Sequence, residues 1–223
     1  QARREFTANV SHELKTPLQG IIGSAELIEN GMVKPEDMPR FIGHIRTEAQ
    51  RLVALIADII RLSQLDEGVE MPKENVELLS LAGEVAEDLR AAADKASVTI
   101  TTDGQSSIVF GVRRLLYEML YNLCDNAIKY NRPGGSIRIH VENREQEAAI
   151  SVLDTGIGIA PEHQSRIFER FYRVDKSHSK ASGGTGLGLS IVKHAAMYHG
   201  GKVALESEPG RGTEIRVTLP KER

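Results

Sequence analysis

The chain contains 223 residues, 40% of them hydrophobic and 26% charged, and its formal net charge is −3 at pH 7. These values are those of an ordinary globular protein of one large or two modest domains, and they give no sign of direct nucleic-acid binding. The single Cys124 excludes an internal disulfide framework, and there is no apolar run of about 18 residues that would span a membrane.

The first residues suggest that the sequence is cut from a longer protein. It starts at Gln1, without an initiator methionine and without a signal-peptide pattern. We therefore expect further regions upstream, and any membrane attachment would lie in them. A lone cysteine also fits a reducing compartment such as the cytoplasm.

The first 66 residues have the periodicity of two amphipathic helices separated by a turn. Apolar residues recur at spacings of three to four or their sums in both segments, at Phe6, Val10, Leu14, Ile21, Ala25 and Ile28 and then at Phe41, Ile45, Leu52, Leu55, Ile56, Ile59 and Leu62. Asn30-Gly31, Pro35 and Pro39 mark the turn between them. An antiparallel pair of helices has little core of its own, so we expect a homodimer in which a second copy completes a four-helix bundle.

The remainder predicts a different kind of domain. Residues 67–74 are polar and indicate a linker, and residues 75–223 mix helix and strand patterns. We expect helices at 79–93, 112–130 and 187–198, and strands at 98–101, near 108, at 136–141, 148–153, 202–206 and 213–219. The chain is therefore predicted to be α+β, with the hairpin followed by an α/β sandwich in which helices cover one face of a mixed sheet.

The long segment between Thr155 and Gly186 predicts no regular structure. Irregular segments longer than about 12–15 residues in a compact domain are usually lids, binding loops or disordered. Because this one lies between two glycine-rich motifs, a nucleotide lid is the favoured interpretation.

Five motifs follow one another along the chain, at residues 6–18, 122–130, 154–159, 168–173 and 184–189. In that order they resemble the phosphoacceptor, asparagine, first glycine, phenylalanine and second glycine boxes of bacterial sensor histidine kinases. The resemblance covers nearly the whole chain. It implies a gyrase-type ATP-binding domain, ATP and Mg²⁺ as ligands, and a response-regulator aspartate as the partner. It also implies a parent protein anchored at the cytoplasmic face of the cell membrane.

The phosphoacceptor motif centres on His12, whose imidazole nitrogen can attack phosphorus from an exposed helix position. Glu13 can hydrogen-bond to the other ring nitrogen and accept its proton. Pro17 lacks an amide hydrogen, so we expect a bend beside His12. Glu13 and Thr16 together resemble the family's phosphatase motif, although Thr16 could instead bond back to a helix carbonyl.

The asparagine motif places Asn122 and Asn126 four residues apart, so both carboxamides point the same way from one helix. The resemblance implies that their oxygens ligate Mg²⁺, that Lys129 neutralises phosphate oxygens and that Tyr130 packs on adenine. A solvated polar face is the alternative, but apolar neighbours such as Leu123 place this helix against a core.

The first glycine motif begins with Asp154, at the end of an apolar strand. A carboxylate only accepts hydrogen bonds, so it suits the amino group of adenine and rejects the carbonyl of guanine. Gly156 and Gly158 let the backbone approach the base, and Ile159 completes the predicted contact. An ordinary Asp-Thr-Gly turn is the alternative.

The second glycine motif precedes a helix, whose first amides can cradle phosphates; its predicted contacts are Gly184, Thr185, Gly186, Leu187 and Gly188. The preceding residues 176–180 do not form a strand pattern, which argues against a dinucleotide fold, and no P-loop motif is present. Arg170 and Arg173 could reach the γ-phosphate, or could merely pack on Asp175 or face solvent.

The predicted function is ATP-dependent phosphorylation of His12, followed by transfer to an aspartate of a response regulator. Two alternatives remain. The same scaffold could act mainly as a phosphatase of that regulator, or it could be a dimeric ATP-binding switch without chemistry. A zinc centre finds no support, since His194 and His199 lack the spacing of a metal-binding helix.

Overall fold

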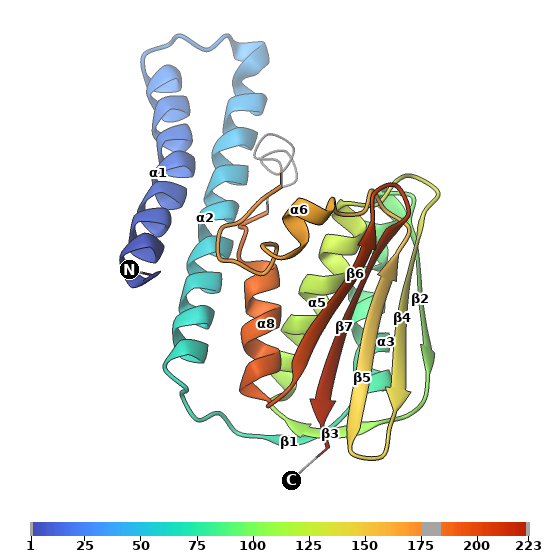
Figure 1. Ribbon diagram of the computed structural model, residues 1–223. Coiled ribbons are helices and arrows are strands. Elements are labelled where there is room, and N and C mark those ends of the chain that lie inside the picture. Colours follow the sequence, from blue (N-terminus) through green and yellow to red (C-terminus); the bar gives the residue numbers. More distant parts are fainter. Residues whose placement is uncertain (1, 175–183, 222–223) are drawn as a thin grey trace.

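A computed structural model describes residues 2–174 and 184–221 of the chain (Figure 1), with the side chains of residues 2–5 left out of the description. The predicted hairpin is confirmed. Helix α1 (Ala2–Glu29) and helix α2 (Met38–Asp66) run side by side, joined by the short 3₁₀ helix η1 (Pro35–Asp37). Helix α1 continues through Pro17, which is buried.

The turn after α1 forms where the sequence predicts it. Gly31 has a φ of +66°, a left-handed conformation that costs glycine little. The amide of Met32 then donates to the carbonyl of Leu27, and the amide of Gly31 donates to that of Ile28. These bonds satisfy the last carbonyls of the helix, which explains why α1 ends here.

The second domain is built on a five-stranded sheet in the order β2-β4-β5-β7-β6. Its strands are β2 (Thr99–Gly104), β4 (Ser136–Asn143), β5 (Glu147–Asp154), β6 (Lys202–Glu208) and β7 (Gly212–Pro220). Strands β2 and β4 pair in parallel and every other pair is antiparallel, so the sheet is mixed, as predicted.

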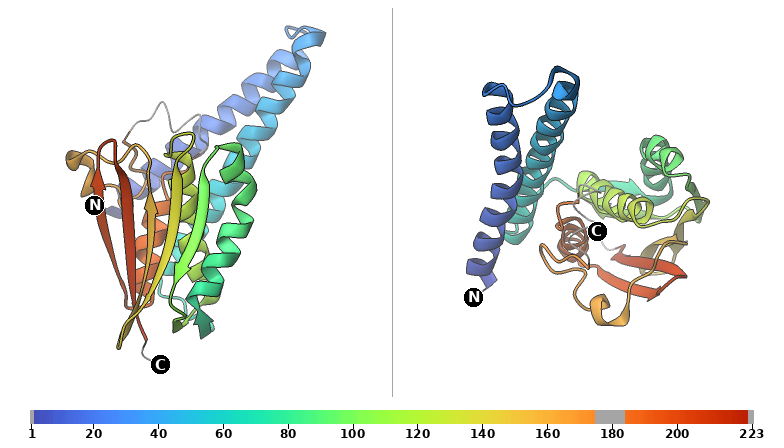
Figure 2. Two further views of the ribbon diagram at one scale, coloured as in Figure 1. Left: turned by 90° about the vertical axis from the view of Figure 1, so that its right-hand side faces the viewer. Right: turned by 90° about the horizontal axis from the view of Figure 1, so that it is seen from above.

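Four helices cover one face of this sheet (Figures 1 and 2). They are α3 (Leu78–Asp88), the short α4 (Arg90–Lys95), α5 (Arg113–Lys129) and α8 (Gly188–Tyr198). The other face presents mainly polar and charged side chains, such as Arg138 and Arg216. The predicted arrangement of helices on one face of a mixed sheet is therefore confirmed.

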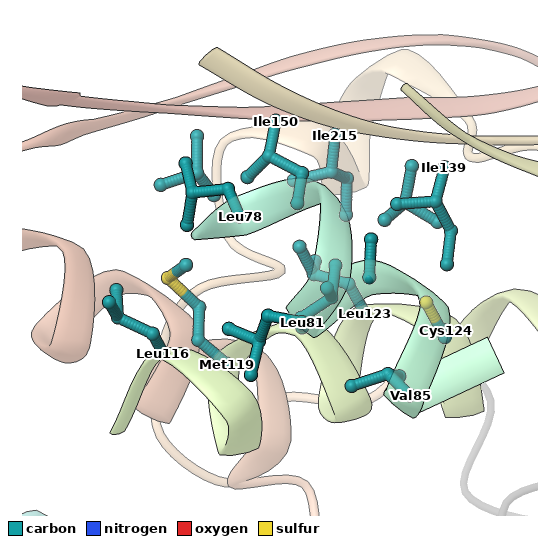
Figure 3. Close-up of a cluster of buried hydrophobic side chains, with 14 of the residues drawn as sticks. Leu78, Leu81, Val85, Leu116, Met119, Leu123, Cys124, Ile139, Ile150 and Ile215 are labelled. Atoms are coloured by element: carbon teal, nitrogen blue, oxygen red, sulfur yellow. The ribbon is translucent and has the colours of Figure 1, made fainter. Parts of the chain in front are cut away.

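Helix α5 lies at the centre of the core, where Leu116, Met119 and Leu123 are almost fully buried (Figure 3). They pack against Leu81 of α3 and Ile139 of β4. Burying one such side chain stabilises the fold by about 1.5–3 kcal/mol. The buried face of α5 is therefore held firmly, which fixes the helix and the residues on its other face. Burial also raises the pKa of Cys124 far above its usual value, which makes this thiol unreactive.

The structure differs from the sequence-based assignment in three places. The helix expected at residues 79–93 is divided at Leu89 into α3 and α4. A short strand β1 (Glu74–Glu77) pairs with β3 (Ile108–Gly111), so Glu74 lies in a strand rather than in the linker. Strand β1 was missed because only Val76 of its four residues is apolar and buried, and one apolar residue gives no alternation.

The described part of the expected irregular segment includes the helical turn α6 (Pro161–Gln164). Part of the predicted lid, including residues 176–180, lies outside the described residues. None of the helices in the described part of the chain is both long enough and apolar enough to cross a bilayer.

A histidine fixes the start of α5 against the end of α8. The amide of Val112 donates to Nε2 of His199, at 2.9 Å, and Nδ1 of the same ring lies 2.7 Å from the carbonyl of Ala195. These contacts require a neutral imidazole with its hydrogen on Nδ1. Burial lowers the pKa of His199, while the bond to Ala195 opposes this change.

The depressed pKa of His199 predicts an acid-sensitive fold. The unfolded chain takes up a proton at this residue near pH 6.5, whereas the folded chain resists protonation until a lower pH. The stabilising contribution is therefore complete above the unfolded pKa and is lost as the pH falls through the folded pKa. We expect the free energy of unfolding, measured with urea, to decrease less between pH 7.5 and 5.5 in His199→Gln than in the unaltered protein. His44→Gln, on the exposed surface of α2, is the control; equal slopes in all three proteins would contradict the prediction.

Candidate active site

His12 lies on the exposed side of α1, with 80% of its side chain accessible to solvent. Its Nδ1 is 3.8 Å from the nearer carboxylate oxygen of Glu13, so a modest shift of either side chain would bring them to hydrogen-bonding distance. The hydroxyl of Thr16 donates to the carbonyl of His12 at 3.3 Å, which is the local bond considered as the alternative for this residue. The phosphatase role of Thr16 therefore stays a prediction.

Glu13 also contacts the second domain. Its other carboxylate oxygen lies 3.3 Å from Nη2 of Arg173, whose side chain is only 9% exposed. The same guanidinium nitrogen donates to the carbonyl of Gly184 at 2.6 Å. Burial lowers the pKa of Arg173, and the charge of Glu13 opposes that effect. The group expected to act as a base is thus paired with an arginine in this arrangement.

Helix α5 carries Asn122 and Asn126 half-buried on one side, as the spacing predicts. A Cβ atom at Gly188, the first residue of α8, would lie 3.2 Å from the oxygen of the Asn122 carboxamide. Glycine at 188 therefore lets the start of α8 approach α5 closely. Lys129 is one turn further along and forms an ion pair with Asp125 at 2.6 Å, so a phosphate would compete with Asp125 for it.

The donor set around α5 fits Mg²⁺ bound mainly through phosphates. Among the described residues there is no cluster of three or more His, Cys, Asp or Glu that could hold a metal without help. Mg²⁺ commonly takes only one or two protein oxygens and fills its remaining positions with water and phosphate. Two carboxamide oxygens one turn apart meet that requirement.

Asp154 stands at the end of β5, where the strand leaves the sheet. One carboxylate oxygen accepts a hydrogen bond from the amide of Gly156 at 2.7 Å. Burial raises the pKa of Asp154, and the hydrogen bonds from the amides of Gly156 and Thr213 counter that rise. These two amides orient the carboxylate at the edge of the sheet. The contact of Asp154 with adenine stays a prediction.

The loop after Asp154 passes close to two other segments. A Cβ at Gly156 would lie 2.4 Å from the carbonyl of Tyr130, and the amide of Ile157 donates to that same carbonyl at 3.0 Å. Gly158 has a φ of +69°, and a Cβ there would lie 2.1 Å from the carbonyl of Glu208. Only glycine fits either position. The amide of Ile159 donates to the hydroxyl of Ser207 at 2.8 Å, so the loop is fixed at both ends.

Arg132 provides a further anchor for this loop that the sequence analysis missed. Its guanidinium donates to three backbone carbonyls, those of Thr155 at 2.8 Å, Gly156 at 3.0 Å and Gly210 at 2.5 Å. Arg132 lies in a turn signal, Asn-Arg-Pro-Gly-Gly, that gives no indication of such a role. The three carbonyls come from two segments, residues 155–156 and Gly210, which are far from Arg132 and from each other in the sequence, so only the folded chain brings them to one side chain.

The second glycine motif leads directly into α8. Gly186 has a φ of +76°, and its carbonyl accepts a hydrogen bond from the amide of Phe171. Phe171 itself has a positive φ of +62°, which is unusual for a residue other than glycine. Leu187 is fully buried, and the helix that follows has no side-chain N-cap. The hydroxyl oxygen of Thr185 accepts a hydrogen bond from the amide of Leu187 at 3.2 Å. The first turn of α8 thus offers the uncapped amides that a phosphate group prefers.

Arg170 contacts the hairpin rather than the glycine motifs. Its Nη2 lies 2.6 Å and 2.7 Å from the two oxygens of Asp66 and 3.1 Å from Nε2 of His194. Its guanidinium also stands over the ring of Phe6, with 4.9 Å between the guanidinium carbon and the ring centroid. The contact of Arg170 with a nucleotide phosphate stays a prediction, and it would require the arginine to leave Asp66.

Helix α2 supplies acidic and basic partners that periodicity did not identify as functional. Asp58 accepts a hydrogen bond from the hydroxyl of Thr185 at 2.6 Å, and Arg61 forms an ion pair with Glu118 of α5 at 2.7 Å. The available signal was a charged residue inside an apolar run, since Asp58 stands between Ala57 and Ile59. Such a residue on a buried face needs a partner.

Comparison with known proteins agrees with this arrangement. Residues 2–68 match the family described as "His Kinase A (phospho-acceptor) domain", and residues 111–223 match "Histidine kinase-, DNA gyrase B-, and HSP90-like ATPase". The second match alone covers half of the chain. The chain therefore belongs to the histidine kinase family, and it corresponds to the catalytic core of a sensor histidine kinase.

Two relatives illustrate the extent of the match. The chain is 41% identical, over 98% of its length, to the sensor-like histidine kinase SenX3 of Mycolicibacterium smegmatis, and it covers 58% of that protein. It is 35% identical, over 99% of its length, to the sensor protein SrrB of Staphylococcus aureus, of which it covers 38%. The chain thus spans 58% of the length of the first relative and 38% of the length of the second.

Solved structures share the arrangement of both domains. The Acinetobacter baumannii histidine kinase AdeS, at 23% identity, shows the same fold with a TM-score of 0.79 over 95% of this chain and 98% of that one. Histidine kinase ThkA, solved in complex with the response regulator protein TrrA, gives 0.78 at 26% identity over 98% of this chain and 61% of that one. Full-length ShkA in complex with AMPPNP gives 0.72 at 29% identity over 97% and 45%.

The three hydrogen bonds of Arg132 predict a role in binding the base. In Arg132→Ala the loop that follows Asp154 loses its anchor, while the segments at the start of α8 are unchanged. We expect the dissociation constants of adenosine and of ADP, measured by calorimetry, to rise by a similar factor of about ten. Arg138→Ala removes the same charge from an exposed position on β4 and is the control. An unchanged affinity for adenosine in Arg132→Ala would contradict the prediction.

Proposed function

We propose that this chain is an ATP-dependent protein-histidine kinase core that phosphorylates His12 and then passes the phosphoryl group to an aspartate of a response-regulator receiver domain. The observation that carries the proposal is the position of α2. This helix packs against α1, which bears His12, and its Asp58 contacts Thr185 at the glycine-rich start of α8. Helix α2 therefore contacts both the helix that bears the proposed acceptor and the candidate nucleotide site.

Different residues of the second domain are proposed to bind the base, the phosphates and the Mg²⁺ ion of the nucleotide. Asp154 accepts a hydrogen bond from the amino group of adenine, and the loop held by Arg132 and Tyr130 shapes the pocket for the ring. The uncapped amides at the start of α8 receive phosphate oxygens. Asn122 and Asn126 would hold Mg²⁺, which neutralises phosphate charge when it is bound.

The transfer itself requires few protein groups, because phosphoryl transfer depends mainly on positioning and charge neutralisation. A lone pair on the His12 imidazole attacks the γ-phosphorus of the substrate ATP. A bond between nitrogen and phosphorus forms while the bond from phosphorus to the bridging oxygen breaks, and ADP leaves with that electron pair. Glu13 accepts the proton from the other ring nitrogen. Glu13 is paired with Arg173 in this structure, so the arginine leaves the carboxylate before the proton moves.

The partner of the phosphorylated His12 is proposed to be a receiver-domain aspartate, in line with the ThkA structure solved together with a response regulator. We propose in addition that Glu13 and Thr16 orient water against the phosphorylated aspartate of that regulator, which gives the core a phosphatase activity. The parent protein is proposed to hold this core at the cytoplasmic face of the membrane through segments outside the chain.

The hairpin is proposed to form a homodimer through its exposed apolar face. Val53, Ile56 and Ile60 of α2 are 69%, 46% and 53% exposed and stand three and four residues apart, so they form one stripe. Leu18 and Ile22 of α1 are each 48% exposed, four residues apart. A second hairpin would bury both stripes and complete a four-helix bundle.

The kinase hypothesis predicts a phosphoramidate on one residue. Incubation with γ-labelled ATP and Mg²⁺ is expected to give a label that is labile in acid and stable in alkali, and His12→Gln is expected to remove at least about 99% of it, because the only attacking nitrogen is lost. His44→Gln is the control. Firm binding of Mg·ATP without any label in the unaltered protein would instead support the switch without chemistry.

The dimer hypothesis predicts that a charge in the α2 stripe separates the subunits. We expect the unaltered protein to have the mass of a dimer in light scattering at micromolar concentration, and Ile56→Glu to have the mass of a monomer, because a carboxylate would be buried in the bundle. Ile108→Glu, at a similarly exposed position on β3, tests for an effect of charge alone. A monomeric unaltered protein would refute the proposed bundle.

A further inference from the structure

Asp58 is an acidic residue of the hairpin that reaches the candidate phosphate site of the other domain. Its Oδ2 accepts a hydrogen bond of 2.6 Å from the hydroxyl of Thr185. Burial raises the pKa of Asp58, and the bond to Thr185 opposes that rise. Glu118 repels its charge and Lys129 attracts it, so the carboxylate also shares an electrostatic environment with the asparagine-box helix α5.

The place of this carboxylate is unexpected for a site built to receive anions. Thr185 and the uncapped amides after Leu187 form the positive end of α8. The phosphates of a nucleotide would bring negative charge to the same donors. Asp58 and the phosphates therefore compete for Thr185, and their charges repel one another across a partly buried interface where screening by solvent is weak.

The rest of the interface holds Asp58 in place. Leu55 and Leu62 lie one turn before and one turn after it on α2, and they pack against Leu187 and Ile191 in a fully buried cluster. Arg61 adds a hydrogen bond of 2.7 Å from its Nη2 to the carboxylate of Glu118 on α5, and its Nε forms an ion pair with the other carboxylate oxygen, also at 2.7 Å. The carboxylate of Asp58 cannot move far from Thr185 while α2 remains packed on α8.

We propose that Asp58 is a positioning residue through which the hairpin opposes the binding of nucleotide phosphates, so that docking of α2 on α8 and occupation of the phosphate site weaken each other. This inference rests on the proposed nucleotide site. It assigns to the hairpin a direct effect on nucleotide affinity. By linkage, nucleotide binding loosens the packing of the hairpin by the same factor.

The inference predicts a dependence on phosphate number. Asp58→Asn keeps the size of the side chain and an oxygen that accepts from Thr185, but removes the negative charge. Calorimetry on the full 223-residue chain, with Mg²⁺ present, should show ATP binding about tenfold more tightly to this variant than to the unaltered protein. The gain should be smaller for ADP and absent for adenosine, which carries no phosphate.

Two further variants keep the test decisive. Glu29→Gln removes a negative charge from an exposed position at the far end of α1 and should change no affinity. Arg61→Gln weakens the docking of α2 without altering Asp58, and it should also favour ATP over adenosine. The double variant Asp58→Asn with Arg61→Gln should gain no more than Asp58→Asn alone, because both changes remove the same opposition.

Each other outcome overturns the inference. An equal gain for ATP, ADP and adenosine would show a general loosening of the domain instead of a charge effect. A loss of ATP affinity in Asp58→Asn would show that the carboxylate supports Mg²⁺ or the phosphates. If Asp58→Asn left the ATP affinity unchanged while Arg61→Gln still increased it, Asp58 would have no part in the effect of the hairpin. The proposed function would then still stand. Failure of the unaltered protein to bind adenosine or ATP would refute the proposed function together with this inference.

Discussion

The packing of α2 against the start of α8 is the contact on which the arrangement of the two domains depends. Leu62 and Leu187 are fully buried there, although they belong to different domains. Buried apolar surface of this kind provides the stabilisation, since ion pairs near the surface contribute little by themselves. The charged and polar pairs around the cluster set the register between α2 and α8, because a shift of either helix would leave buried donors or acceptors without partners.

In this docked arrangement, several groups expected to act on substrate are paired with protein partners. Glu13 contacts Arg173 and Thr185 donates to Asp58. Lys129 is paired in the same way with Asp125 of its own helix. In the proposed function, nucleotide binding and proton transfer would therefore exchange one set of partners for another. The net free energy of each exchange is small compared with either interaction alone, which makes the balance between the arrangements sensitive to single charges.

The base end of the candidate site is built differently, because it does not depend on the hairpin. Asp154 is held by backbone amides of its own domain, and the loop after it is fixed by Tyr130 and Arg132. Close contacts allow only glycine at positions 156 and 158. This end of the site is therefore preorganised, whereas the phosphate end is shared with α2. A change in the position of α2 is therefore expected to affect the phosphate end of the site and to leave the base end unchanged.

The sequence by itself determined the local structure and the chemical inventory. The apolar period predicts α1, α2 and α5, and the alternating strands predict most of the sheet. The motifs predict His12, Asn126 and Asp154 as candidate site residues, since each of these signals lies within a few consecutive residues. The sequence did not predict strand β1 or the division of the helix at Leu89, because both are decided by pairing or packing with distant segments.

Only the tertiary structure decided which of these groups meet. Glu13 and Arg173 are separated by 160 residues, and Asp58 and Thr185 by 127. No periodicity or motif specifies such pairs, because a local pattern fixes the face on which a side chain lies but not the segment that will cover that face. The pairing follows from how the hairpin and the second domain bury apolar surface against each other, and that is a property of the whole chain.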